Sequence, residues 1–295
     1  MATYFDTGGR MKGSAVFLDT TIQIARLIHS KDTKRRIAER LCAYGFTVTG
    51  EIVKQEFKRR LLQEAKSLLR LLDKHNSFSQ VLHQVQRWSH PLHRRKQQIH
   101  IQMIATLFGN EGGPSLVERA KLHLHYLITQ GIDDFEEDVG MVIRASGCAC
   151  ARCPIQEKVR YKQYDFGPDR CSDPGAAGCQ IGNLLKTRVA ELEKILRRLQ
   201  KLTAQERTAE LGQAAEFITA ILQDATVARS HDPCYKIGDL IIALESHGIP
   251  TFFTMNGKES QHFCRELDQT LIVRPSSPDK ADVECDKGNT SWPKF

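Results

Sequence analysis

The chain has 295 residues, and 41% of them are hydrophobic, which is enough to build one large core or two modest ones. Its longest apolar runs are too short to span a membrane, and the N-terminus lacks the apolar segment of a signal peptide. We therefore expect a cytoplasmic protein with no membrane partner. The 42 Lys and Arg residues outnumber the 35 Asp and Glu residues, and the resulting net charge of +7 suits a polyanionic partner.

The N-terminal part of the chain predicts alternating strands and helices. Residues 15–18 form a continuous apolar run, as in a buried parallel strand, and Asp-Thr-Thr and a helical stretch follow directly. A second helix is expected at 34–41, a second strand at 46–49, and then a long helix that carries Glu56. This alternation is typical of an α/β fold with a parallel sheet.

The C-terminal part repeats this pattern. A helix is expected at 235–246, a strand at 249–254 and a last strand at 271–273. We expect residues 1–60 and 230–276 to form one discontinuous domain and residues 277–295, which are rich in Ser, Pro, Asp and Lys, to form a flexible tail.

Residues 61–229 read almost entirely as helix, which predicts a large helical insertion between the two halves of the sheet. Within it, apolar residues at helical spacing in 185–199 and in 211–222 predict two helices that pair as a hairpin.

Three acidic residues break the apolar patterns around them. Asp19 follows a buried strand at the end where α/β sheets usually place their ligands. Glu56 and Asp239 each fall on the apolar face of a predicted helix. Buried carboxylates are costly unless they meet a cation or hydrogen-bond donors, so three that converge predict a divalent metal site. Magnesium and manganese prefer such oxygen ligands.

Each of these residues also has a simpler interpretation. Asp19 and Asp239 could cap helices, and Glu56 could pair with a lysine or an arginine.

Four short motifs, in this order along the chain, resemble those of the PIN domain nucleases. They are Val16–Thr21, Thr49 with Glu56, Gly238–Ala243, and Thr254–Asn256 followed by Phe263. The resemblance implies a PIN-like sheet flanked by helices and a metal-dependent endonuclease that acts mostly on RNA. It further implies Asp19, Glu56 and Asp239 as Mg²⁺ or Mn²⁺ ligands, with Asn256 as the fourth position of the catalytic set.

The chain departs from the family pattern at Asn256, where many relatives carry an acid. Asp232 lies close by in sequence and could supply that charge, or it could simply be a surface residue. The insertion is also far larger than the compact family core, so the substrate of small relatives does not transfer.

In such a site, a metal ion lowers the pKa of a bound water and offsets the charge that develops on phosphate during hydrolysis. The chain has neither the Gly-rich loop of a P-loop NTPase nor the Gly-x-Ser-x-Gly elbow of a serine hydrolase.

Five of the nine cysteines lie in one short stretch, which in a protein without an export signal favours metal binding over disulfides. They are Cys148, Cys150, Cys153, Cys171 and Cys179. Structural Zn²⁺ sites usually take their ligands from two cysteine groups separated by a loop. We therefore expect four of the five cysteines to bind zinc and to stabilise the insertion. Free thiols and an iron–sulfur cluster are the alternatives.

The loop between the two cysteine groups mixes cations with aromatic residues, a combination that can bind phosphates and stack on bases. These candidate nucleic-acid contacts are Arg160, Lys162, Tyr164 and Arg170. The alternative is that they cover the zinc module. Basic segments at 58–60 and 94–96 would add attraction for phosphates if they face the cleft.

The sequence thus predicts a metal-dependent endoribonuclease with RNA, or single-stranded DNA, as its partner. An inhibitory or regulatory protein partner is also compatible with this prediction, and the oligomeric state stays open. The main alternative is a PIN-like binding scaffold with a weakened site, and a second one is a module whose functional centre is the zinc.

Overall fold

The computed structural model describes residues 15–87, 94–108, 114–152, 155–158, 163–165, 180–224, 237–273 and 284–285.

The central element is a six-stranded sheet with the strand order β3-β2-β1-β6-β7-β8. The strands are β1 (Ala15–Leu18), β2 (Phe46–Gly50), β3 (Met141–Ile143), β6 (Thr251–Thr254), β7 (Thr270–Val273) and β8 (Glu284–Cys285). The first five in the sheet order run parallel, and β8 pairs antiparallel with β7. The predicted α/β class with a parallel sheet is therefore confirmed, and the four predicted core strands coincide with β1, β2, β6 and β7.

Side chains of the central strands alternate between two apolar layers, because successive residues of a strand point to opposite faces. One layer contains Phe17, Val48, Phe252 and Leu271. The other layer contains Val16, Leu18, Phe253 and Ile272. The rings of Phe17 and Phe252, on neighbouring strands, stack with centroids 5.3 Å apart. Burial on both faces explains why the central strand β1 is a continuous apolar run.

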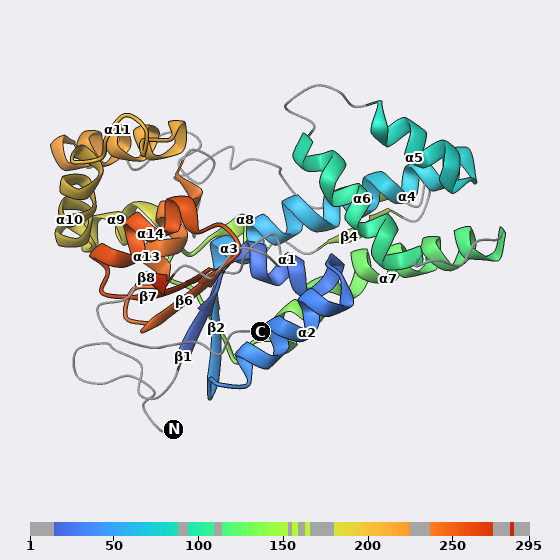
Figure 1. Ribbon diagram of the computed structural model, residues 1–295, viewed down its shortest axis with the longest axis horizontal. Coiled ribbons are helices and arrows are strands. Elements are labelled where there is room, and N and C mark those ends of the chain that lie inside the picture. The colour runs from blue at the N-terminus through green and yellow to red at the C-terminus, as the bar shows by residue number, and fades with distance from the viewer. Residues whose placement is uncertain are drawn as a thin grey trace.

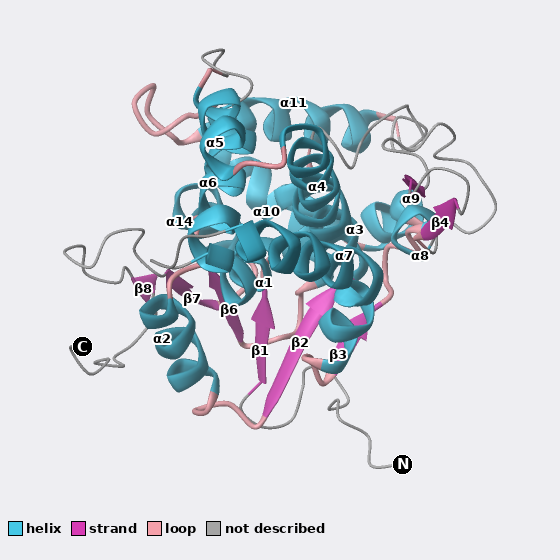
Figure 2. Cartoon of the chain, turned by 90° about the vertical axis from the view of Figure 1, so that its right-hand side faces the viewer, coloured by secondary structure: helices cyan, strands magenta, loops and turns pink. Residues whose placement is uncertain are grey.

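Helices cover both layers. The helices α1 (Thr20–Ile28) and α2 (Lys31–Leu41) contribute Ile22, Ala25 and Ile37 to the second layer. The helices α3 (Glu51–Phe57), α13 (Gly238–Glu245) and α14 (Gly257–Glu266) contribute to the first layer through Ile52, Val53, Leu240, Ile241 and Phe263. In Figure 2 the arrowheads of β1 and β2 point toward the helical bulk of the molecule.

The helix that carries Glu56 is longer than α3 alone. It continues through a π-helical turn, η1 (Lys58–Leu62), into α4 (Gln63–His75). The helices α5 (Phe78–Gln86), α6 (Arg94–Phe108) and α7 (Pro114–Glu137) pack around α4 and form one lobe, on the right in Figure 1. The predicted boundary between residues 60 and 61 therefore falls inside a continuous helix.

A second lobe, on the left in Figure 1, contains α9 (Ile181–Thr187), α10 (Val189–Gln200) and α11 (Ala209–Gln223). The helices α10 and α11 contact each other and bury Leu192, Ile195 and Leu199 together with Leu211, Ala214 and Ile218. The predicted hairpin is confirmed. The helix α10 also packs on α14, so the hairpin lies against the sheet domain.

Two strands of the sheet were not predicted. Strand β3 comes from within the predicted insertion and extends the sheet beside β2, where the backbone N–H of Gly140 donates to the carbonyl of Thr47 at 3.0 Å. Strand β8 belongs to the predicted tail, and its two residues pair with β7. Both strands are too short to show a periodic pattern in sequence.

The remaining described elements are short. The helix α8 (Ala149–Arg152) follows β3, and β4 (Gln156–Lys158) pairs antiparallel with β5 (Gln163–Asp165) as a separate two-stranded sheet. None of the described helices is both long and apolar enough to cross a membrane.

Candidate functional site: an acidic pocket

The predicted site residues come together at the carboxyl ends of β1 and β6. Asp19 directly follows β1, and Asn256 follows β6, which is the parallel neighbour of β1. The backbone N–H of Asp19 donates to the carbonyl of Phe253 at 3.0 Å, which continues the pairing up to the site. This is the edge at which open α/β sheets place their ligands.

Three donors hold the carboxylate of Asp19. Oδ1 accepts from the backbone N–H of Thr20 at 2.6 Å. Oδ2 accepts from the hydroxyls of Thr21 at 2.8 Å and of Thr254 at 2.7 Å. Asp19 is therefore both the N-cap of α1, as one interpretation of the sequence had it, and a fixed acidic group in the pocket.

Glu56 is buried, with a side chain only 5% exposed. Its Oε2 accepts from the Thr20 hydroxyl at 2.8 Å, and its Oε1 lies 2.9 Å from Nη2 of Arg60, one helical turn further along. The first turn of α13 approaches the same carboxylate: a Cβ on Gly238 would stand 3.1 Å from Glu56 Oε1. A glycine at this position therefore lets Asp239 come close to Glu56.

Asp239 lies in the first turn of α13 and is half-buried. Burial raises its pKa to about 7, and the negative charges of Asp19 and Glu56 add to the rise, while Arg60 opposes it. Asp239 and the buried Glu259 receive no hydrogen bond from any residue that the structure describes. Among the described residues, none competes with a ligand for these two carboxylates.

These groups line one pocket with a volume of about 190 Å³. Its polar lining consists of Asp19, Thr21, Glu56, Arg60, Glu210, Asp239, Asn256, Glu259 and Ser260. A water molecule occupies about 30 Å³ of liquid, so the space suits a hydrated ion or a small polar group. All four predicted catalytic residues thus line the same pocket, although they come from distant parts of the chain.

Sequence reasoning missed two of the acids. Glu259 lies in the first turn of α14, three residues beyond Asn256, and this position after a predicted strand was a usable signal. Glu210 belongs to α11 and reaches the pocket because α10, the partner of α11 in the hairpin, packs on α14. Asp232, the other residue considered for the missing charge, lies outside the described residues.

The donor set fits a hard divalent cation, because carboxylate oxygens with room for water are what Mg²⁺ and Mn²⁺ prefer. Within the described ranges, however, no three His, Cys, Asp or Glu side chains are arranged to hold a metal ion as they stand. Glu56 is turned to Arg60 and Thr20, and Asp19 is tied to its threonines. Coordination therefore requires some of these side chains to exchange partners.

Two of the five predicted zinc ligands belong to the described residues. Cys153, Cys171 and Cys179 lie outside the described residues. Cys148 is buried, with its backbone N–H donating to Oε2 of Glu51 at 2.9 Å, and Cys150 is half-buried. These two cysteines form no disulfide.

Among the predicted nucleic-acid contacts, Tyr164 is the one that the structure describes, and it is only 3% exposed. Its hydroxyl bonds to Nδ1 of His125, so its ring packs inside the protein and offers no face to a base. The prediction for Tyr164 does not agree with this burial. Arg160, Lys162 and Arg170 lie outside the described residues.

The basic segment at 58–60 divides between two roles. Lys58 is 2% exposed, and its ammonium group donates to the carbonyl of Cys150 at 3.0 Å, whereas Arg60 lines the acidic pocket. In the segment at 94–96, Lys96 lies 3.3 Å from Glu64, and the other two side chains are outside the description.

A second pair of buried carboxylates lies at the other end of α3. Glu51 and Glu245 are 2% and 3% exposed, and Oε2 of Glu245 accepts from the backbone N–H of Ile52 at 3.1 Å. Burial raises the pKa of Glu245 to about 8, and the Glu51 carboxylate adds to the rise. A Cβ on Gly50 would stand 2.1 Å from Glu245 Oε2, so a larger residue there would have to displace this carboxyl group.

Comparisons of the chain with protein-family models, with curated proteins and with solved structures find no match. The pocket therefore has to be interpreted from its own chemistry.

Proposed function

We propose that the acidic pocket is the active site of a PIN-like endonuclease that uses Mg²⁺ or Mn²⁺ to hydrolyse phosphodiester bonds of RNA. One observation carries the proposal: acids from β1, α3, α13 and α14 meet in one pocket, and two of them, Asp239 and Glu259, have no described hydrogen-bond donor.

Unbalanced negative charge is the physical argument for a cation. Asp19, Glu56 and Glu259 are each less than 10% exposed, and Asp239 is half-buried beside them. Arg60 is the one cation among the described lining residues. Desolvated carboxylates cost several kcal/mol unless donors or cations compensate them, and one arginine does not balance these acids, so a metal ion would stabilise the group.

The side chains would divide the work in ways that their contacts support. The three donors on Asp19 fix its orientation in advance. Asp239 and Glu259 have oxygens that no described residue engages, and Oε1 of Glu56 becomes accessible when Arg60 moves away from it. When bound, a divalent ion supplies a Lewis acid that activates water and offsets charge on the phosphate. The net charge of +7 favours a polyanionic substrate.

The decisive test is cleavage of labelled single-stranded RNA and DNA oligonucleotides by the wild type in Mn²⁺ and in EDTA. We expect Mn²⁺-dependent cleavage of RNA, and a loss of about a hundredfold or more in Asp239→Asn, because an amide is a poor ligand for such ions. Asp239 is the preferred site because no described donor depends on its charge.

Asp32→Asn is the matched control, since Asp32 also lies in the first turn of a helix but is half-exposed on α2 and paired with arginines. Equal cleavage by wild type and Asp239→Asn would show that the activity belongs to a contaminant or to another site.

The scaffold alternative has its own support in the exposed amide of Asn256 and in the lack of a ready-made metal group among the described residues. It predicts RNA binding that persists in EDTA without cleavage in Mn²⁺. The same experiment therefore separates the two functions.

A further inference from the structure

Arg60 occupies an unusual place for a permanent cation. It belongs to η1, the single π-helical turn between α3 and α4, and such turns inside α-helices occur frequently at functional sites. Its side chain is 21% exposed, and it lines the acidic pocket together with Asp19, Glu56 and Asp239. The other cations of the same segment do not line this pocket.

The contacts of Glu56 imply that a divalent ion would compete with Arg60 for this carboxylate. Oε2 is engaged by the Thr20 hydroxyl and Oε1 by Arg60, so both oxygens of this buried carboxylate already have a partner. A divalent ion that binds Glu56 has to share or displace Arg60. Arginine side chains keep their charge in proteins, so only a movement of the guanidinium can relieve the repulsion. It has to move or find another anion.

We propose that Arg60 is a phosphate-binding residue of this site. Its guanidinium is paired with Glu56 in this structure. It would move to a phosphate of a bound nucleic acid when a divalent ion binds Glu56. The proposal rests on the proposed nuclease function and adds to it the group that binds the phosphodiester. The guanidinium fork can bind a phosphate through two parallel hydrogen bonds, which a lysine cannot reproduce.

Partial exposure makes the transfer feasible. The Arg60 side chain is 21% exposed and lines the pocket, so it is not locked inside the core and has room to turn from Glu56 to a ligand in the pocket. Lys58 cannot take this role, since it is buried and bound to the Cys150 carbonyl.

The test compares Arg60→Gln and Arg60→Lys with the wild type. Arg26→Gln is the matched control, because Arg26 has the same 21% exposure and an ion pair of 3.2 Å with Asp138 but does not line the pocket. The readouts are Mn²⁺ affinity by calorimetry without nucleic acid, and the affinity of a single-stranded RNA oligonucleotide in Ca²⁺ as a function of salt.

We expect Arg60→Gln to bind Mn²⁺ several-fold more tightly, since the competing cation is gone. It should bind RNA about tenfold more weakly, with a salt slope smaller by about 0.7, the value for one phosphate contact on a single strand. Arg60→Lys should recover the slope but not the full affinity, and Arg26→Gln should match the wild type.

Two outcomes overturn the inference, and they differ from failure of the proposed function. If the wild type binds Mn²⁺ and cleaves RNA while Arg60→Gln keeps its salt slope, Arg60 only supports the helix. Weaker Mn²⁺ binding in Arg60→Gln would likewise assign it a structural role. If the wild type binds no Mn²⁺ at all, the nuclease proposal and this inference fall together.

Discussion

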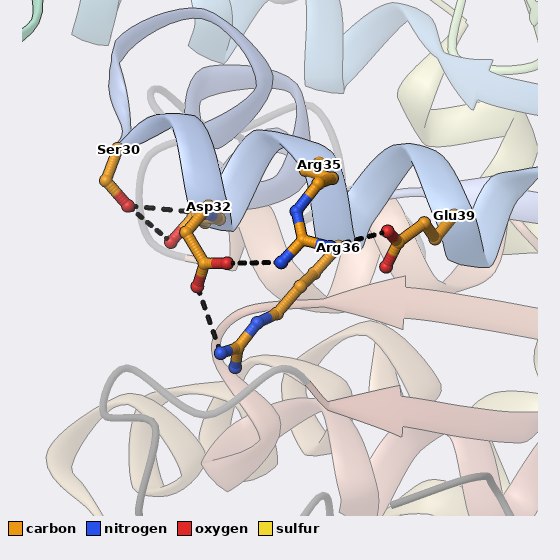
Figure 3. Close-up of polar contacts among 6 residues, drawn as sticks. Ser30, Asp32, Arg35, Arg36 and Glu39 are labelled. Atoms are coloured by element: carbon orange, nitrogen blue, oxygen red, sulfur yellow. Dashed lines mark hydrogen bonds and ion pairs between the residues drawn. The ribbon is translucent and has the colours of Figure 1, made fainter. Parts of the chain in front are cut away.

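Acidic side chains on α2 are exposed and paired with arginines, whereas those in the described lining of the pocket are mostly buried and outnumber the cations. On α2, Asp32 lies 2.8 Å from Arg35 and 3.0 Å from Arg36, and Glu39 lies 3.1 Å from Arg35 (Figure 3). Every acid there has an arginine within one helical turn, and all face water. In the pocket, by contrast, acids outnumber cations, and most of them are buried.

The difference separates charges that arginines balance on a helix surface from charges that the proposed metal ion would have to balance. Exposed pairs three or four residues apart contribute only about 0.2–0.5 kcal/mol each, and solvent and salt screen them. A buried carboxylate is destabilising unless donors or cations compensate it, and the described lining of the pocket holds more acids than its one arginine can balance. The predictions below test that contrast, from the largest expected effect to the smallest.

Mn²⁺ should stabilise the protein through the pocket. At a free concentration of 100 times its Kd, an ion that binds only the folded state adds about 2.7 kcal/mol to the free energy of unfolding. Thermal unfolding with and without Mn²⁺ measures this gain. The gain should disappear in Asp239→Asn and persist in Asp32→Asn; a gain that survives in Asp239→Asn would place the ion elsewhere.

The Mn²⁺ affinity should depend on pH. With the pKa of Asp239 raised to about 7, its carboxyl keeps a proton below that pH and has to lose it before it can bind an ion. Affinity should therefore rise by about tenfold per unit, or about 1.4 kcal/mol, as the pH approaches 7 from below, and level off above it. Calorimetry across pH 5 to 9 measures this; a flat profile would contradict the role of Asp239.

Glu245→Gln should stabilise the protein at alkaline pH. The carboxyl of Glu245 loses its proton at an ordinary pKa of 4.5 when unfolded but only at about 8 when folded. Its stabilising contribution is complete below pH 4.5 and is lost as the pH rises through this window. We expect the variant to gain about 1 kcal/mol or more at pH 8 and nothing at pH 4. Urea unfolding at both pH values checks the difference.

Asp32→Asn should have the smallest effect. The charge that it removes is half-exposed and shared between Arg35 and Arg36. We expect a loss of at most about 0.5 kcal/mol, which salt abolishes, because pairs of this kind are screened. Urea unfolding at low and high salt measures it. A loss of more than about 1 kcal/mol in the free energy of unfolding would mean that an exposed acid matters as much as one in the pocket.

Much of the fold was readable from local patterns. The apolar run at β1 is continuous because a central parallel strand is buried on both faces, so it stands out in the sequence. The strands β2, β6 and β7 contain shorter apolar stretches next to threonines. The spacing of apolar residues in α10 and α11 likewise predicted their pairing. Three carboxylates drew attention because each stands where an apolar residue would be expected. Those local misfits were enough to name Asp19, Glu56 and Asp239.

Only the tertiary structure decided which charges share the pocket with them. Glu210 arrives with the packed hairpin, and Arg60 is aimed by the helical turn after Glu56, so neither assignment follows from local sequence alone. It also decided that β3 joins the sheet and that Tyr164 is buried. The physical reason is the same throughout: an apolar or acidic pattern reports the surroundings of one segment, whereas the sum of charges at a point depends on segments that only folding brings together.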